Sequence, residues 1–304
     1  MGTCARLRYL RETMRVIRNI LARVGGAAAG FAVTSAMAAP QPWEWTLQPA
    51  ATDMMRQIRW FQDYTLWFIV PITLLVMVLL GYCIFRFNAK RNPVPSKTTH
   101  NTLIEVIWTV LPVVVLLFIA IPSFQLLTAQ YNPKDEPKLT VKATGNQWNW
   151  DYEYETTGQL SFNSAILADS DRAKLGKENL AEYPRLLTVD HEMVVPVNAM
   201  VRVLVTGADV IHSFAMPPFG IKEDAVPGRI NETWFKAEKE GIYYGQCSEL
   251  CGKDHAFMPI AIRVVSQEQY DNWYKMAVSD LDGANKALMA EVDNAKTKNV
   301  AAAN

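Results

Sequence analysis

The sequence has 304 residues, half of them hydrophobic, and its 30 basic side chains balance its 30 acidic ones. A net charge of zero argues against a nucleic-acid-binding protein, whose binding surface would be basic. Only four cysteines are present, so the chain is not a scaffold held together by disulfides.

Residues 1–39 have the composition of a cleaved leader. Six arginines and one acid occur there, and an apolar run of small residues leads to Ala36, Met37 and Ala38, an A-x-A cleavage pattern. An Arg-rich, acid-poor start also fits an organelle transit peptide. We favour a bacterial export signal, because the apolar segment and the cleavage pattern follow directly. Cys4 would then be removed with the leader.

Residues 40–130 are predicted to form a transmembrane hairpin. Two apolar runs, at about 65–85 and about 104–127, are each long enough as a helix to cross a hydrocarbon core of about 30 Å. The connection at 86–103 contains four basic side chains and no acid: Arg86, Lys90, Arg91 and Lys97. The positive-inside rule therefore predicts a cytoplasmic loop in a bacterial inner membrane and a periplasmic C-terminal domain.

Residues 131–266 read as an all-β domain. Short β-rich runs separated by turns favour an antiparallel sandwich or barrel. The predicted strands lie at about 139–144, 148–154, 186–189, 200–206, 233–236, 241–244 and 260–265. The charged segment at about 159–184 interrupts this rhythm and is interpreted as a solvated insertion.

Residues 267–304 are predicted to form a C-terminal helix and a tail. Tyr270, Trp273, Tyr274 and Ala277 fall on one side of that helix. Beyond Leu288 the sequence is alanine-rich and polar, and a frayed or disordered tail is expected.

A cluster of candidate metal ligands lies between residues 246 and 258. Cys247, Cys251, His255 and Met258 follow one another at short spacing, and His212 occurs upstream. Soft sulfur donors favour copper, and imidazole suits copper as well as zinc. Two other interpretations remain open, namely a structural zinc site and a disulfide between the two cysteines.

Three motifs, CSELCGKDHAFMP, DVIHSF and GNQWNWDYEYE, resemble subunit II of haem-copper cytochrome c oxidase of the bacterial aa3 type, from about residue 60 to about residue 274. The resemblance implies a cupredoxin-like β domain that holds a dinuclear copper centre, CuA. It implies bridging thiolates from Cys247 and Cys251, one imidazole per copper from His212 and His255, and weak ligands from Met258 and the Glu249 carbonyl.

The same resemblance implies an electron-transfer role beside oxidase subunit I and subunit III. Cytochrome c would deliver electrons at Trp148, and Glu105 would mark the entrance of a proton channel. The Glu249 carboxylate would bind magnesium at the junction with subunit I. Four acids would guide cytochrome c: Glu153, Asp190, Asp209 and Asp224.

Each of these roles has a simpler alternative. Trp148 can be a core side chain, Glu105 an interfacial carboxylate, and the acids a solvated charged face. A membrane-anchored copper chaperone with a thioredoxin fold also uses C-x-x-x-C, but with one membrane segment and a downstream His. A quinol-oxidising relative would lack the copper ligands, and a structural zinc-bound subunit would leave Met258 unexplained. The chain has no C-x-x-C-H haem motif, so it does not reduce oxygen by itself.

Overall fold

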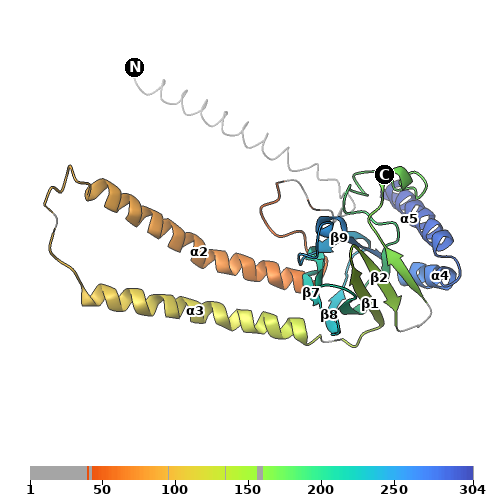
Figure 1. The fold of residues 1–304 in the computed structure, drawn as a ribbon, viewed down its shortest axis with the longest axis horizontal. Coiled ribbons are helices and arrows are strands. Elements are labelled where there is room, and N and C mark those ends of the chain that lie inside the picture. The colour runs from red at the N-terminus through yellow and green to blue at the C-terminus, as the bar shows by residue number, and fades with distance from the viewer. Residues whose placement is uncertain (1–39, 41–42, 95, 134, 156–159, 304) are drawn as a thin grey trace, which may run out of the picture. The chain divides into compact units, whose positions relative to one another are not determined.

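The structure is a computed structural model that describes residues 40, 43–94, 96–133, 135–155 and 160–303. The predicted leader, with Cys4 and the A-x-A pattern at Ala36 to Ala38, lies outside the described residues. The described residues form a helical hairpin followed by a β domain and two C-terminal helices (Figure 1).

The hairpin consists of α2 (Asp53–Arg86) and α3 (Thr102–Tyr131), both long and apolar enough to cross a membrane. Each helix extends beyond its apolar run, because a polar side chain caps its first turn. The Thr52 hydroxyl accepts a hydrogen bond from the Met55 N–H, and the Asn101 side chain accepts one from the Ile104 N–H. The Tyr64 hydroxyl of α2 donates to the Phe118 carbonyl of α3 at 3.0 Å and joins the two helices.

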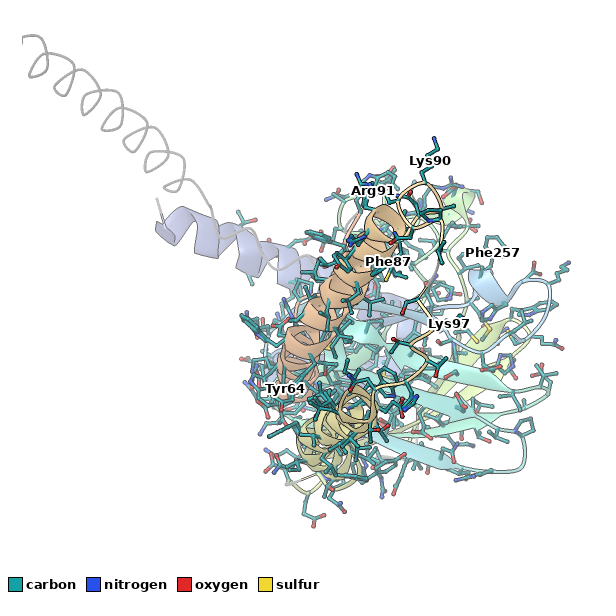
Figure 2. All side chains as sticks on the ribbon, turned by 90° about the vertical axis from the view of Figure 1, so that its left-hand side faces the viewer. Tyr64, Phe87, Lys90, Arg91, Lys97 and Phe257 are labelled. Carbon is teal, nitrogen blue, oxygen red and sulfur yellow. The ribbon has the colours of Figure 1, made fainter. Side chains whose placement is uncertain are left out.

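The connection between α2 and α3 presents its basic side chains at the end of the hairpin opposite the β domain (Figure 2). Lys90, Arg91 and Lys97 are all exposed there. Arg91 also donates to the Phe85 carbonyl at 3.2 Å, which helps to end α2.

Two five-stranded sheets make up the β domain, which confirms the predicted cupredoxin-like fold class. One sheet has the order β3-β2-β1-β5-β8 and the other the order β4-β10-β9-β6-β7. Most neighbours are antiparallel, but β1 pairs with β5 and β4 with β10 in parallel. The strands are β1 (Leu139–Asn146), β2 (Asn149–Tyr154), β3 (Ser161–Ser164), β4 (Met193–Pro196), β5 (Met200–Gly207), β6 (His212–Met216), β7 (Ile221–Ala225), β8 (Asn231–Lys236), β9 (Gly241–Cys247) and β10 (Pro259–Val265).

Alternating side chains of the two sheets fill a single core. Trp150, Tyr152 and Tyr154 of β2 all point inward and are at most 1% exposed. The Trp150 ring packs edge-on against Phe214 of the other sheet, with ring centroids 5.3 Å apart. Burying a large side chain of this kind contributes about 2 kcal/mol or more, so β2 anchors one wall of the domain.

Several strands differ from those predicted. The run at 186–189 is not a strand, and only an isolated bridge joins Val189 to Ile166. β3, β4, β6 and β7 were not predicted. In β4 and β6 every residue is buried, which removes the alternation of a half-buried strand.

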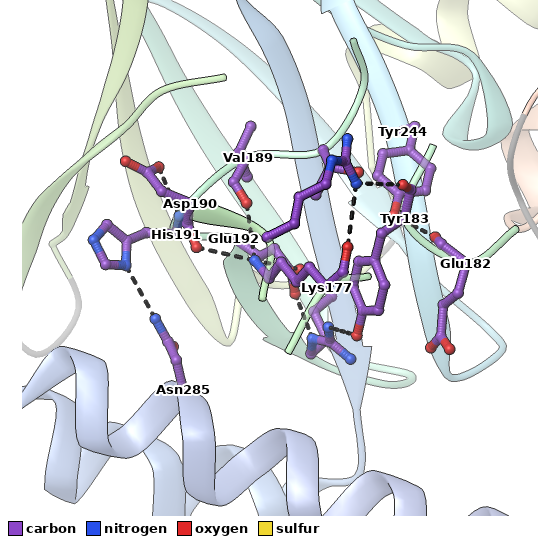
Figure 3. A network of polar contacts seen from close by, with 12 residues as sticks. Lys177, Glu182, Tyr183, Val189, Asp190, His191, Glu192, Tyr244 and Asn285 are labelled. Atoms are coloured by element: carbon purple, nitrogen blue, oxygen red, sulfur yellow. Dashed lines mark hydrogen bonds and ion pairs between the residues drawn. The ribbon is translucent and has the colours of Figure 1, made fainter. Parts of the chain in front are cut away.

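The segment predicted to be a solvated insertion is solvated only in part. Asp169, Lys174 and Glu178 are exposed, whereas Lys177 is buried in a polar network against the β domain (Figure 3). Lys177 pairs at 3.0 Å with the carboxylate of Glu192, which also accepts from Arg263 on β10. Lys177 further donates to the Val189 and Asp190 carbonyls, each at 2.9 Å. The insertion is therefore a structural part of the domain.

Two helices, α4 (Gln267–Ala277) and α5 (Leu281–Ala303), follow the last strand. Tyr270, Trp273 and Ala277 are buried on one side of α4, as the sequence predicted, and a capping box starts that helix at Ser266. The expected frayed tail is instead helical to Ala303. Leu288 is 3% exposed, so the first half of α5 packs against the domain.

Candidate metal centre

Two free thiols form the centre of the site. Cys247 is the last residue of β9, and Cys251 lies four residues later in the loop that leads to β10. Both are buried, with 6% and 4% exposure, and their sulfur atoms lie 3.9 Å apart. That separation is far longer than a disulfide bond and leaves both sulfur atoms free to share a metal.

His212, the first residue of β6, directs one ring nitrogen toward the thiols. Its Nδ1 atom lies 3.9 Å from Cys247 Sγ, and its Nε2 atom lies 2.8 Å from the Asp209 carboxylate. An Nε2–H that donates to Asp209 leaves the Nδ1 lone pair free for a metal. Gly145 of β1 makes room for this ring, since a Cβ there would lie 2.9 Å from the imidazole carbons.

The Asp209 carboxylate is held ionised beside His212. Partial burial raises the pKa of Asp209. Hydrogen bonds from His212 and from the backbone N–H groups of Val210 and Gln147 lower it by more, so the net pKa is below the ordinary value. A charged acceptor orients the imidazole more firmly than a neutral one.

The remaining predicted ligands surround the second thiol. His255 Nδ1 and Met258 Sδ each lie 3.5 Å from Cys251 Sγ. Met258 is 1% exposed, so its thioether lies in the interior, on the side of the loop that faces the thiols. The Glu249 carbonyl lies 3.4 Å from Cys247 Sγ. The structure thus brings together all of the donor groups that the sequence pattern singled out.

The donor chemistry fits copper better than zinc. A structural zinc ion takes four ligands, commonly from Cys and His, whereas this site adds a buried thioether and a carbonyl around two adjacent thiols. Burial and the neighbouring Cys247 thiol raise the pKa of Cys251 to about 12, so a bound metal must displace its proton.

Comparison with known proteins identifies the family. The profile for the transmembrane domain of cytochrome c oxidase subunit II matches residues 40–126, and the profile for its periplasmic domain matches residues 139–265. A probable cytochrome c oxidase subunit 2 of Rickettsia conorii is 52% identical over 77% of this chain and 72% of its own. The chain belongs to the cytochrome c oxidase subunit II family.

Two further members are also similar. Subunit 2 of Cereibacter sphaeroides is 44% identical over 83% of this chain and 89% of its own. The crystal structure of the periplasmic domain of subunit II from Bradyrhizobium japonicum is 57% identical and covers 47% of this chain and 95% of its own, with a TM-score of 0.42. As a member of this family, the chain is a subunit of a haem-copper terminal oxidase, anchored in the bacterial inner membrane with its β domain in the periplasm.

Trp148 lies beside the ligand loop in this subunit II chain. A Cβ on Gly252 would lie 2.9 Å from its ring, and Lys253 Nζ is 5.9 Å from the ring centroid. The preceding residue, Gln147, donates from its side chain to the Cys251 carbonyl at 2.7 Å. Trp148 is half-buried, unlike its fully buried neighbour Trp150.

The four predicted docking acids differ in their surroundings. Asp209 orients His212, and Asp190 accepts hydrogen bonds from the Ala165 and His191 N–H groups. Glu153 pairs with Lys142 at 2.8 Å, whereas Asp224 is exposed on β7. Asp224 therefore best retains the character of a docking acid.

The other two predicted carboxylates lie at different places in the structure. Glu249 is exposed on the ligand loop, next to Leu250, which is 78% exposed. Glu105 is in the first turn of α3 and accepts from the Asn101 N–H at 3.2 Å.

Sequence reasoning missed two residues that shape the site and assigned a third, Asp209, to docking alone. Gly145 admits the His212 ring, Gln147 holds the loop at Cys251, and Asp209 orients His212. Only Asp209 left a signal in the sequence, because a carboxylate three residues before a ligand histidine can turn back onto its ring.

Proposed function

We propose that this chain is the electron-entry subunit of its oxidase. It accepts electrons from cytochrome c at a dinuclear copper centre, CuA, and delivers them to haem in subunit I, where oxygen is reduced to water and protons are pumped. The observation that carries this proposal is the pair of thiols 3.9 Å apart, surrounded by imidazole and thioether donors.

The proposed ligand set is the one that the family resemblance implies, and the contacts of the two thiols support it. Cys247 and Cys251 would hold the copper through their thiolates, His212 and His255 would each supply one imidazole, and Met258 and the Glu249 carbonyl would be weak ligands. When bound, the copper pair supplies a one-electron centre whose charge is spread over two metals. The β9–β10 loop, fixed between two buried strands, keeps the ligands in nearly constant positions.

Trp148 is the proposed point of electron entry. Its half-buried ring packs against the loop at Gly252, the residue after Cys251. An electron would therefore cross one packing contact and a short stretch of backbone between Trp148 and the site. Cytochrome c is generally basic around its haem edge, and Asp224 and Glu153 would attract it in a salt-dependent way. We assign Asp190 and Asp209 smaller parts in docking, because their carboxylates hold local structure.

Two further roles belong to the interfaces with partner subunits. The exposed Glu249 carboxylate, with its carbonyl turned toward Cys247, is free to contribute to a magnesium site completed by subunit I. Glu105 lies in the first turn of α3, next to the basic connection, and is suited to receive protons from the cytoplasmic side. Subunit III is a further proposed partner.

Metal content and electron paramagnetic resonance of the purified full chain test the proposal. After loading with copper, we expect two copper ions per chain and one unpaired electron shared between them. One zinc per chain, or a disulfide between Cys247 and Cys251, would return the chain to a structural or chaperone role. If copper binds as expected, cytochrome c oxidation by the assembled complex then tests electron entry.

A further inference from the structure

The first turn of α2 is attached to the β domain by a compact set of contacts. Thr52, which is 1% exposed, donates from its hydroxyl to the Phe219 carbonyl at 2.8 Å. The same hydroxyl accepts from the Met55 N–H at 3.0 Å, so one side chain both caps the helix and binds the domain.

Two backbone hydrogen bonds of the preceding residue, Ala51, strengthen this attachment. The Ala51 N–H donates to the Pro218 carbonyl at 2.9 Å, and the Glu238 N–H donates to the Ala51 carbonyl at 3.0 Å. Ala51 is thus held between two separate segments of the β domain.

An ion pair and a close backbone approach complete the contact. The Arg56 guanidinium donates to both carboxylate oxygens of Glu238, one at 2.8 Å, and to Asp53 at 3.0 Å. Gly220 has a φ of +73°, and a Cβ there would lie 3.1 Å from the Met55 Cα atom, so the backbones of the helix and the domain come close together at this glycine.

The segment that receives these bonds leads directly from the metal centre. The 3₁₀ turn η2 (Pro217–Phe219) follows β6, the strand that begins with His212. We propose that Thr52 and Arg56 are positioning residues, which clamp the β domain to the membrane helix and so fix the copper centre relative to its electron acceptor in the membrane. This inference rests on the electron-transfer function proposed above.

A distance measurement on the full chain in lipid nanodiscs tests the clamp without any metal. One nitroxide label is attached to Cys83 in α2, and a second to Cys at position 161 in the S161C variant, with the other cysteines replaced by serine. We expect one narrow distance distribution for the parent chain. The double variant Thr52→Val with Glu238→Gln should broaden it, whereas Thr52→Ser alone keeps the hydroxyl and should leave it narrow.

Electron exit from the reduced copper centre to haem is then measured in the assembled oxidase that retains its native cysteines. Because the rate of electron transfer falls steeply with the distance between donor and acceptor, the double variant should slow exit severalfold while its copper spectrum is unchanged. Lys174→Gln is the matched control, since it removes another ion pair, with Asp171 at 2.7 Å, far along the chain from the clamp.

The outcomes distinguish failure of the clamp from failure of the proposed electron-transfer function. An unchanged distance distribution in the double variant overturns the clamp, and so does broadening with a normal exit rate, because partner subunits would then position the domain. Absence of a two-copper signal in the parent chain defeats the electron-transfer function instead, and the label distances still show whether the clamp exists.

Discussion

The Nε2 atom of His212 lies 2.8 Å from the Asp209 carboxylate, although the two residues had been expected to serve different purposes. One was predicted to be a copper ligand and the other a docking acid. Their contact makes Asp209 part of the candidate metal centre, since it determines which imidazole nitrogen faces the thiols.

Asp209→Asn should therefore weaken copper binding. An amide can still accept from His212 but lacks the charge that orients the ring, and loss of such a partner costs about tenfold or more in metal affinity. Copper competition titration measures the effect. Asp224→Asn is the control, because Asp224 is exposed and should alter only the salt dependence of cytochrome c docking. Equal copper affinities in both variants would make Asp209 an ordinary docking acid.

Met258→Leu should leave copper bound but shift the midpoint potential of the centre. The thioether lies 3.5 Å from Cys251 Sγ, and leucine fills nearly the same volume without a sulfur atom. Potentiometry followed by absorbance checks this. Met193→Leu, a buried substitution on β4, controls for the change in packing. Complete loss of copper from the Met258 variant would mean that its thioether is an essential ligand.

Trp148→Phe should slow electron entry from cytochrome c and leave the copper spectrum intact. The smaller ring withdraws the contact with Gly252 and reduces the flat surface offered to a partner. Rapid mixing with reduced cytochrome c measures entry. The matched variant Trp234→Phe, on β8 beside Arg202, should behave as the parent. A normal entry rate for Trp148→Phe would reassign this ring to a packing role.

Glu192→Gln should lower the free energy of unfolding at neutral pH by about 3 kcal/mol, because it leaves Lys177 and Arg263 buried without their carboxylate. Burial raises the pKa of Glu192, but Arg263 and Lys177 outweigh it and lower this pKa to about 2. A carboxyl with a depressed pKa stabilises the fold above its unfolded value of about 4.3, and this contribution disappears as the pH falls toward about 2.

Denaturant unfolding of the full chain at pH 7 and pH 3 provides the measurement. The stability gap between parent and Glu192→Gln should be large at pH 7 and smaller at pH 3. Asp171→Asn, which breaks the exposed pair with Lys174, should change stability little at either pH. A stability difference between parent and Glu192→Gln that is the same at both pH values would show that the pKa of Glu192 is equal in the folded and unfolded states.

The donor groups of the metal centre could be predicted because four of them lie within twelve residues and two are soft thiols. The hairpin could be predicted equally well, since apolar runs of that length with at most one charged residue are typical of membrane-spanning helices. Local composition carried both predictions. In the structure, His212 contacts the Cys247 sulfur, and His255 and Met258 contact the Cys251 sulfur.

The insertion could not be predicted in the same way. Lys177, Glu192 and Arg263 are far apart in the sequence, and each alone resembles a solvated surface charge. Only the folded chain shows that the two cations share the Glu192 carboxylate next to α5. β6 was missed for a related reason, because burial on both faces removes the alternation that marks a strand.

The two parallel strand pairs have a consequence for how the protein folds. Leu139 pairs with Val201, and Met193 pairs with Ile262, so each sheet requires partners that are distant along the chain. Such non-local pairings form slowly, because the chain loses the entropy of closing a long loop before the new contacts stabilise it. The strand after the ligand loop, β10, needs both β9 and β4 to be complete. Until then, Cys247 and Cys251 are unprotected thiols in an oxidising compartment, and the rate of sheet closure sets how long they stay exposed to oxidation.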